Sequence, residues 1–257
     1  MGLKVERILV IKLSALGDFV LALAAMKRIR LAHPKAHITL LTTPPFEALA
    51  KICPYFNAVD TGGKPRGFAA WMDLRRRIKS VNYDRVYDLQ TSARSSRIFQ
   101  MLRPGPPRWS GIALGCALPH KNPLRNGMHT LERHADQLMY AGIWDDAPTT
   151  PGSAPAPDLS WVLKAHATAR PPPGANRPRP YVMFVPGGAA HRPEKRWPVE
   201  SYAELARILY SRGFDIVIIG GPQEAELAHA IQRSTPRARD LTGRTDFAKV
   251  ALLGARA

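Results

Sequence analysis

One stretch near the start of the chain, residues 7–30, limits what this sequence can fold into more than any other. Residues 7–11 are mostly apolar and β-branched, which predicts a parallel strand buried on both faces. A polar turn at 14–18 follows. The apolar run 19–26 then predicts a helix packed against the sheet, with basic residues at its end that complement the helix dipole. A strand, a turn and a helix in this order predict an open α/β sheet.

The same alternation continues along the chain. Further strands are predicted at 37–42, 57–60, 83–89, 181–185, 214–219 and 239–241. Further helices are predicted at 46–52, 68–80, 130–141, 159–167, 197–212, 223–234 and 247–253. The proline- and glycine-rich segment 104–126 is expected to be irregular. Strands and helices that alternate in this way predict doubly wound α/β domains.

A proline-rich stretch separates two such series and sets the predicted domain boundaries. We expect an N-terminal, Rossmann-like domain at 1–165, a linker at 166–180 and a C-terminal domain at 181–257. The C-terminal part offers fewer strands than the usual sheet of about five or six. We therefore expect the second domain to be incomplete in this chain.

The chain carries a large excess of positive charge. It has 37 Lys or Arg residues against 20 Asp or Glu residues, a formal net charge of +17. This excess indicates an anionic partner, such as a nucleic acid, a phosphorylated sugar or an anionic membrane surface, although a general basic bias would give the same charge. The two cysteines form no CxxC pattern, which indicates neither a metal site nor a disulfide framework and fits a reducing cytoplasm. No stretch approaches the ~20 apolar residues of a membrane span, so any membrane contact is expected to be peripheral.

The turn after the first strand supplies candidate catalytic residues. Ligands bind at the carboxyl ends of strands in open α/β sheets, so Ser14, Gly17 and Asp18 are expected at such a site. Transfer of a group to a hydroxyl needs a base that takes the proton, and the Asp18 carboxylate fits that role. An acidic residue at the start of a helix is also common for structural reasons alone.

The second half supplies candidate phosphate-binding residues. It lacks both G-x-G-x-x-G and G-x-x-x-x-G-K-[ST], but glycines join a strand to a helix at Gly187–Gly188 and again at 220–222. Backbone N–H groups at such junctions suit a pyrophosphate. Lys195 would neutralise a phosphate leaving group, and Glu224 would accept hydrogen bonds from a ribose. Taken singly, a solvated lysine and a glutamate at a helix start are the more ordinary explanations.

Basic residues also gather on the helix predicted at 68–80 and after the strand predicted at 83–89. Arg76, Arg77 and Arg94 belong to this set. We expect part of it to contact an anionic acceptor or an anionic membrane face. A solvated helix face explains the helical arginines equally well, because consecutive residues of a helix point in different directions.

Five short motifs follow one another in a fixed order. They are Lys12-x-Ser14-x-x-Gly17-Asp18, Asp88-x-Gln90 with Arg94-Ser95, Pro186-Gly187 followed by Lys195-Arg196-Trp197-Pro198, Gly220-Gly221-Pro222-x-Glu224, and Leu241-Thr242-Gly243-Arg244-Thr245. Together they resemble the family 9 glycosyltransferases, the ADP-heptose:lipopolysaccharide heptosyltransferases, over nearly the whole chain. The resemblance implies a GT-B fold, with two Rossmann-like domains facing a cleft. It also implies inverting transfer of heptose from ADP-heptose to the anionic inner core of lipopolysaccharide.

The resemblance further implies roles for single residues. Asp18 would be the base, Lys195 would bind the donor phosphates, Glu224 would lie near the ribose and Arg244 beside the adenine. We assign Gly187 and Gly188 to the donor as well. The residues assigned to the acceptor are Ser14, Gly17, Gln90, Arg94, Arg76 and Arg77.

The sequence departs from the family at its end. The later Asp-x-Gly-x-x-His motif is absent, so we expect the chain to lack the C-terminal part of the family. No D-x-D pair occurs, so no catalytic metal is expected, and the donor sugar nucleotide takes the place of a cofactor. The expected location is the cytoplasm, with peripheral contact to the inner membrane.

Two other functions compete with sugar transfer. A shortened chain could be an inactive remnant that keeps only acceptor binding. A basic nucleic-acid-binding protein would fit the charge, but the sequence contains no RNP, zinc-finger or helix-turn-helix signature. We therefore expect a glycosyltransferase, with no nucleic acid among its partners.

Overall fold

The computed structural model of the protein describes residues 5–166, 179–188 and 193–257. The chain divides into two units, Met1–Trp161 (unit 1) and Val162–Ala257 (unit 2), and each has a parallel sheet of its own. The linker predicted at 166–180 lies almost wholly outside the described residues. No helix within these ranges is long and apolar enough to cross a bilayer.

The sheet of unit 1 has six parallel strands in the order β3-β2-β1-β4-β5-β6. They are β1 (Arg7–Ile11), β2 (His37–Leu41), β3 (Ala58–Asp60), β4 (Arg85–Asp88), β5 (Arg108–Gly111) and β6 (Leu118–Pro119). The register sets Ile11 opposite Leu41 on one side and opposite Asp88 on the other, so these three strands end level with one another. The strand order reverses between β1 and β4, and this switch point is where ligands bind in open α/β sheets.

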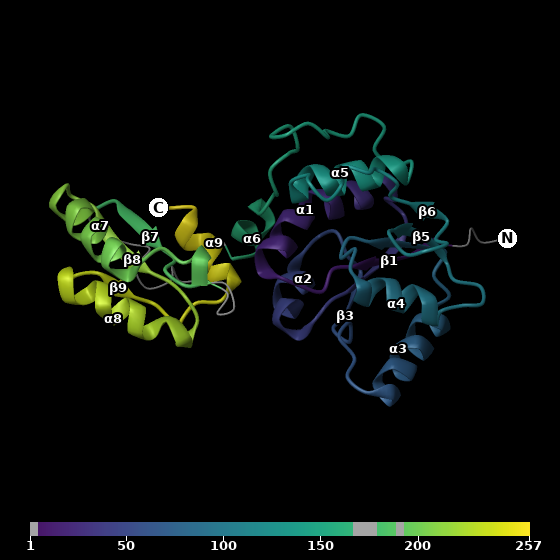
Figure 1. Cartoon of the computed structure of the whole chain (residues 1–257), viewed down its shortest axis with the longest axis horizontal. Coiled ribbons are helices and arrows are strands. Elements are labelled where there is room, and N and C mark those ends of the chain that lie inside the picture. Colours follow the sequence, from purple (N-terminus) through teal and green to yellow (C-terminus); the bar gives the residue numbers. More distant parts are fainter. Residues whose placement is uncertain (1–4, 167–178, 189–192) are drawn as a thin grey trace. The chain divides into compact units, whose positions relative to one another are not determined.

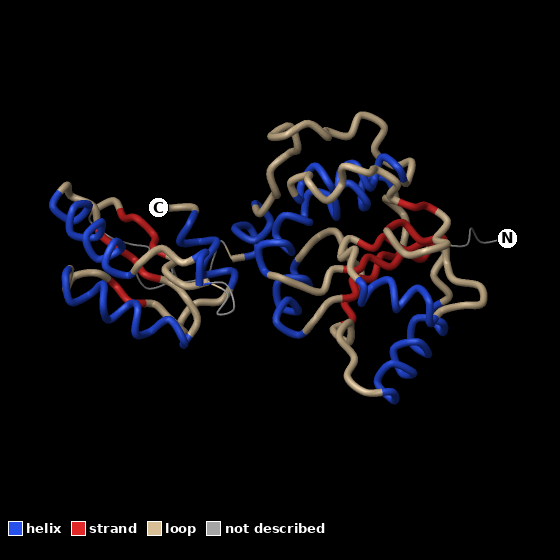
Figure 2. The backbone as a smooth tube through the Cα atoms, in the orientation of Figure 1, coloured by secondary structure: helices blue, strands red, loops and turns tan. Residues whose placement is uncertain are grey.

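Helices cover both faces of this sheet, as the doubly wound prediction requires. The helices of unit 1 are α1 (Leu16–Ala32), α2 (Glu47–Ile52), α3 (Phe68–Val81), α4 (Ala93–Met101) and α5 (Thr130–Tyr140), and α6 (Ser160–Ala165) lies at the division between the units. α1 and α5 pack together over one face, while α3 and α4 cover the other (Figure 1). Leu9 and Ile11 of β1 join the core under α3 and α4, and the alternation of side chains turns Ile8 and Val10 to the opposite face. Figure 2 shows the strands of this sheet between the two helical layers.

Two parts of unit 1 correct the prediction. α1 begins at Leu16 rather than at residue 19, so Asp18 lies in its first turn. Residues 104–126, expected to be irregular, contain β5 and β6. Pairing with β4 gives this segment its strand conformation although its sequence favours none.

The helix α4 is a further element absent from the prediction. Its N-cap is Ser92, whose Oγ accepts a hydrogen bond from the Ser95 backbone N–H (3.3 Å). Ile98 and Phe99 bury its inner face. With few apolar residues the helix is too short to give a clear period, and the cap is its main sequence signal.

In unit 2 the described residues contain three parallel strands in the order β7-β8-β9. The strands are β7 (Tyr181–Phe184), β8 (Asp215–Ile218) and β9 (Arg239–Asp240), and the helices are α7 (Val199–Ser211), α8 (Ala225–Ser234) and α9 (Phe247–Gly254). Two short 3-10 helices, η2 (Pro193–Lys195) and η3 (Pro222–Glu224), also belong to unit 2, while η1 (Pro44–Phe46) belongs to unit 1. α7 and α8 pack on one face over Ile216 and Ile218. α9 packs on the other face over Val217, and the Tyr181 hydroxyl donates to the Leu253 carbonyl oxygen (2.5 Å). The strands and helices predicted for this part are found, with ends shifted by one to a few residues.

Candidate active site

Polar groups from two loops hold the switch point of unit 1 together. The Gln90 Oε1 atom accepts hydrogen bonds from the backbone N–H groups of Leu13 (2.8 Å) and Ser14 (3.2 Å). The Lys12 ammonium donates in the other direction, to the Leu89 carbonyl oxygen (3.2 Å). These bonds clamp the loop after β1 to the loop after β4. Ser14 and Gln90, both predicted from motifs, are therefore neighbours.

Asp18 stands beside this clamp with an exposed side chain in the first turn of α1. Its Oδ2 atom accepts a hydrogen bond from the Ala15 backbone N–H (3.2 Å), which caps the helix. Within the described residues the carboxylate has no further hydrogen bond, so its other oxygen is available to a substrate. This position also lets the helix dipole stabilise the negative charge.

Gly17 contributes space rather than an unusual backbone. Its φ is not positive and it lies within α1, so it does not use the backbone freedom of a glycine. A Cβ atom at Gly17 would have no other atom within 4 Å. The surface next to Asp18 is therefore open.

A buried carboxylate supports the loop that presents Gln90. Asp88 is fully buried, and its Oδ1 atom accepts hydrogen bonds from the backbone N–H groups of Gln90 (3.1 Å) and Thr91 (2.9 Å). Thr91 has a φ of +42°, which is unusual for a β-branched residue. Gln137 of α5 donates to the Asp88 carbonyl oxygen (3.0 Å). Burial raises the pKa of Asp88 to about 6.

Lys12 places a buried cation behind the exposed carboxylate. Burial lowers the pKa of its ammonium to about 8, and the charge of Asp18 counteracts part of this effect. His134 of α5 is fully buried too, and within the described residues neither of its ring nitrogens has a hydrogen-bond partner. Burial, with a contribution from Lys12, holds the pKa of His134 well below its ordinary value.

Lys12, Asp88 and Gln137 support the loops of the candidate site, although the sequence did not single them out as site residues. Lys12 and Asp88 belong to the quoted motifs but had no role assigned to them. The signal that could have identified Lys12 and Asp88 is their position at the end of a strand buried on both faces. A charged side chain is buried there only where hydrogen bonds or an opposite charge stabilise it.

The predicted acceptor-binding arginines do not lie together. Arg94 is exposed in the first turn of α4, directly after the loop that leaves β4. Arg76 and Arg77 lie in the middle of α3. Arg77 pairs with both Asp60 and Asp73, and Arg76 pairs with Asp73 (2.5 Å). The structure thus sets Arg94 at the candidate site and engages the other two in ion pairs on α3.

In unit 2 the candidate donor residues lie where the strands end. A Cβ atom at Gly187, after β7, would come within 2.5 Å of the Glu224 Cγ atom, so a larger residue would force a shift. Glu224 is buried, and its Oε2 atom accepts a hydrogen bond from the Gly221 backbone N–H (2.7 Å). The Glu224 side chain therefore joins the turn after β7 to the turn after β8.

Arg196, the residue after Lys195, connects the segment before α7 to Gly188. The Arg196 guanidinium donates from Nη2 to the Gly188 carbonyl oxygen (2.5 Å). This bond ties the end of the glycine turn to the segment before α7. Lys195, the last residue of η2, is exposed.

Arg244 is exposed in the turn that follows β9. The backbone N–H of Gly243 donates to the Gly220 carbonyl oxygen (2.9 Å), which joins this turn to the turn after β8. Gly243 has a φ of +67°, and a Cβ atom there would lie 3.2 Å from the Pro222 Cγ atom. The three turns form one edge of the sheet, along which lie Gly187, Gly188, Glu224 and Arg244.

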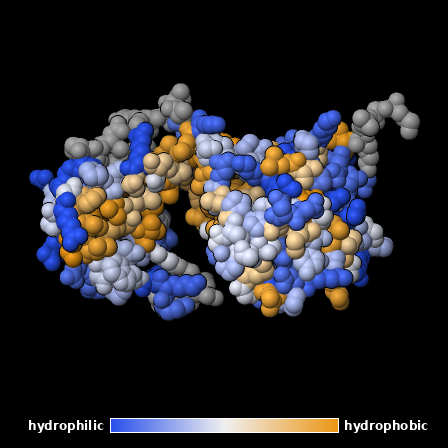
Figure 3. All heavy atoms as spheres, turned by 90° about the horizontal axis from the view of Figure 1, so that it is seen from above, coloured by the Kyte–Doolittle hydropathy of each residue, from blue (hydrophilic) through white to orange (hydrophobic). Residues whose placement is uncertain are grey.

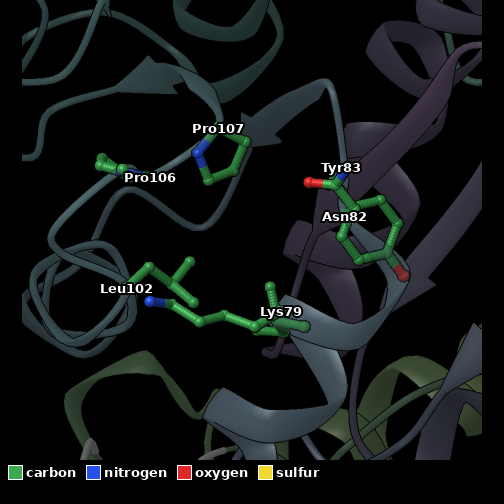
Figure 4. Close-up of a pocket in the computed structure, with 8 residues that line it drawn as sticks. Lys79, Asn82, Tyr83, Leu102, Pro106 and Pro107 are labelled. Carbon is green, nitrogen blue, oxygen red and sulfur yellow. The ribbon is translucent and has the colours of Figure 1, made fainter.

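A cavity of about 350 Å³ lies away from these residues, at the amino end of β4 and β5 (Figure 4). Lys79 of α3 extends towards Leu102 on one side, with Pro106 and Pro107 on the other. None of the predicted site residues lines this cavity. Among the described residues, no group of three or more His, Cys, Asp or Glu side chains could hold a metal ion.

A family model matches most of the chain. Residues 71–257 match the family model described as glycosyltransferase family 9 (heptosyltransferase). The chain is similar to lipopolysaccharide heptosyltransferase 2 of Escherichia coli strain K12, with 25% identity over 274 residues that cover 96% of this chain and 74% of that protein.

Solved structures give the same result for the fold. The glycosyl transferase family 9 structure from Veillonella parvula DSM 2008 aligns with a TM-score of 0.72 and 22% identity, over 100% of this chain and 74% of that chain. The E. coli ADP-heptose lps heptosyltransferase II aligns with a TM-score of 0.71 and 23% identity, over 98% of this chain and 77% of that chain. The likeness confirms the GT-B fold that the sequence predicts.

Proposed function

This chain belongs to glycosyltransferase family 9, and we propose that it transfers heptose from ADP-heptose to a sugar of the lipopolysaccharide inner core. The observation that carries the proposal is the Asp18 carboxylate, exposed with one free oxygen at the switch point of a Rossmann-like sheet. The names of the relatives, which are lipopolysaccharide heptosyltransferases, support the choice of donor and acceptor.

In the proposed reaction Asp18 is the general base. Its carboxylate takes the proton of the acceptor hydroxyl while the hydroxyl oxygen bonds to the anomeric carbon of heptose and the bond to the diphosphate breaks. Displacement in a single step inverts the configuration at that carbon. Ser14, Gly17, Gln90 and Arg94 would hold the acceptor, and the open surface at Gly17 supports this role.

We assign the donor to the edge of unit 2. The backbone at Gly187 and Gly188 would face the diphosphate, and Lys195 would neutralise the charge that develops on it as the sugar leaves. Glu224 would lie near the ribose and Arg244 beside the adenine. With Lys195 in this role, the proposed reaction needs no metal ion.

The acceptor proposed here is anionic and linked to a lipid, which fits the net charge of +17. Arg76 and Arg77 remain candidates for contact with its phosphates, although contact would compete with their ion pairs to Asp60 and Asp73. We propose a cytoplasmic protein that meets the membrane peripherally and binds no nucleic acid.

A donor screen tests the proposal. The protein is incubated with inner-core acceptors that carry no heptose or one heptose, together with ADP-heptose or other ADP- and UDP-linked sugars, and the masses of the products are measured by mass spectrometry. We expect the acceptor to gain one heptose from ADP-heptose alone. Transfer from another sugar nucleotide would overturn the donor assignment.

Two further outcomes would favour the competing functions. Binding of the acceptor with no product from any donor would indicate an inactive, acceptor-binding protein. A gel shift with duplex or single-stranded nucleic acid that persists at physiological salt would indicate a nucleic-acid-binding protein, since non-specific charge attraction weakens steeply as the salt concentration rises.

A further inference from the structure

Three strand-to-helix connections at the carboxyl edge of the unit 1 sheet each present a large, exposed apolar side chain, in the connecting loop or at the first residue of the helix. Phe68 is 80% exposed, Leu124 is 75% exposed and Leu16 is 45% exposed. Each follows a different strand of one parallel sheet, namely β3, β6 and β1. Because parallel strands end at the same edge, these three side chains stand along the edge that carries Asp18.

Backbone bonds fix two of these loops to the ends of the strands. The loop before Phe68 is held by the bond from Gly63 N–H to the Thr42 carbonyl oxygen (2.9 Å). The loop that contains Leu124 starts at His120, whose N–H donates to the Gly111 carbonyl oxygen (2.8 Å). Leu16 opens α1 directly after the clamped loop of β1.

Unpaired cations accompany the apolar side chains. Lys64, Arg66, Arg94 and Lys121 lie in the same loops or at the start of α4, and all are exposed. Throughout the described part of the chain, none of the four forms an ion pair with an acid. The acids closest to Phe68 in the sequence, Asp60 and Asp73, are neutralised by Arg77.

We propose that this edge docks on the surface of an anionic phospholipid bilayer. Phe68, Leu124 and Leu16 enter the boundary between headgroups and acyl chains, and the surrounding cations meet the lipid phosphates. Figure 3 shows that hydrophobic residues also reach the surface of unit 1 on the face seen from above, interspersed with hydrophilic ones. The docked edge sets Asp18 at the membrane surface, so the inference rests on the proposed function in one respect, that the acceptor is linked to a lipid.

Vesicle co-sedimentation without donor or acceptor tests the docking. Vesicles of phosphatidylcholine mixed with phosphatidylglycerol are compared with vesicles of phosphatidylcholine alone. We expect binding to the anionic vesicles only, and a loss of about 10-fold or more in Phe68→Asp/Leu124→Asp, because two inserting side chains are replaced by anions. Lys64→Gln/Lys121→Gln should bind more weakly at low salt and respond less to added salt.

Leu31→Asp is the matched control. Leu31 is 62% exposed, but it lies near the end of α1, at the opposite edge of the sheet. We expect this variant to bind like the wild type. An equal loss in Leu31→Asp, unchanged binding in Phe68→Asp/Leu124→Asp, or equal binding to both vesicle types would overturn the proposal, provided that circular dichroism shows each variant folded.

Two readouts separate this inference from its alternatives. A concentration-dependent dimer that Phe68→Asp/Leu124→Asp abolishes, in the absence of vesicles, would assign the edge to a second copy of the chain and overturn membrane docking. Transfer to a water-soluble acceptor should be unchanged in Phe68→Asp/Leu124→Asp. Membrane docking without any heptose transfer would contradict only the proposed function. Heptose transfer without membrane docking would contradict only this inference.

Discussion

The carboxyl edges of the two sheets are held together by different means. In unit 1 polar side chains join the loops: the half-buried Gln90 and the buried Lys12 bridge the loops after β1 and β4, and the buried Asp88 holds the second loop. In unit 2 the turns approach one another at glycines, with a backbone bond between Gly243 and Gly220 and with one buried side chain, Glu224, packed against Gly187. The first arrangement fixes a reacting side chain in place. The second leaves backbone N–H groups accessible to a ligand, which suits a diphosphate.

The largest expected effect concerns the reacting side chain of unit 1. Asp18→Asn should lower kcat for transfer by ~10²–10⁴, because the general base is lost, while the amide oxygen still caps α1. Steady-state kinetics and thermal melting measure the two consequences. Glu47→Gln is the control, since Glu47 is also an acid in the first turn of a helix, half-buried in α2 and paired with Lys51 (2.7 Å). Wild-type turnover in Asp18→Asn would remove Asp18 from the reaction.

A smaller effect is expected at the charge assigned to the donor edge. Lys195→Ala should lower kcat/KM for the donor by ~10², because a cation that stabilises the departing diphosphate is lost. KM for the acceptor should stay the same. Lys249→Ala is the control, as Lys249 is a lysine of unit 2 that pairs with Asp246 (3.3 Å). A change confined to acceptor kinetics would contradict the division of roles between the two units.

The buried Asp88 carboxylate of unit 1 should make the stability of the folded protein depend on pH. Burial raises the pKa of Asp88 from 3.8 to about 6. Between these values the folded protein holds a proton that the unfolded chain has released, so the free energy of unfolding falls as pH rises through this window. Asp88→Asn lacks this fall and keeps an oxygen that accepts from Gln90 and Thr91.

We therefore expect Asp88→Asn to be about 3 kcal/mol more stable than the wild type at pH 7.5, since the pKa of Asp88 lies about two units above its unfolded value and one unit corresponds to about 1.4 kcal/mol. The two proteins should converge in stability towards pH 4. Urea unfolding at several pH values measures this. Parallel pH profiles would show that Asp88 does not titrate in this window.

The smallest expected effects are on the free energy of unfolding, in variants of one glycine from each of the two sheet edges. Gly187→Ala should lower the free energy of unfolding by about 1–3 kcal/mol, because its Cβ atom would collide with Glu224. Gly17→Ala should change it by less than about 0.5 kcal/mol or raise it slightly, because it meets open space at the start of a helix. Equal losses in both variants would mean that the two edges do not differ in the way described above.

Much of this fold could be predicted because its central elements are strongly patterned. The bounds of β1 were predicted without error since each of its residues after Arg7 is buried and apolar. β5 escaped prediction because Arg108–Gly111 has little strand preference of its own and depends on its pairing with β4. The start of α1 was misplaced because Ser14 and Gly17 favour a turn, whereas the cap formed by Asp18 begins the helix earlier.

The site could be predicted in part. Motif order placed Asp18, Ser14 and Gln90 at strand ends, and the parallel sheet brings those ends together. The sequence could not show which group of Gln90 faces the loop after β1, nor that Arg77 is engaged by acids from two different segments. Both depend on contacts between residues far apart in the chain, whose geometry no local pattern encodes.

The hydrogen bonds between the loops after β1 and β4 also determine which group of the Gln90 amide remains available to a ligand. Two backbone N–H groups point at one atom of its amide, so that atom is the oxygen, and the outward atom is the nitrogen with its two protons. Asp18, in the helix turn that follows the clamped loop, can only accept hydrogen bonds while it is ionised. A hydroxyl group satisfies both neighbours, because it gives a proton and also has lone pairs. An ammonium group has no lone pair for Gln90, and an ether oxygen has no proton for Asp18, so the polarity of this edge favours an alcohol over either.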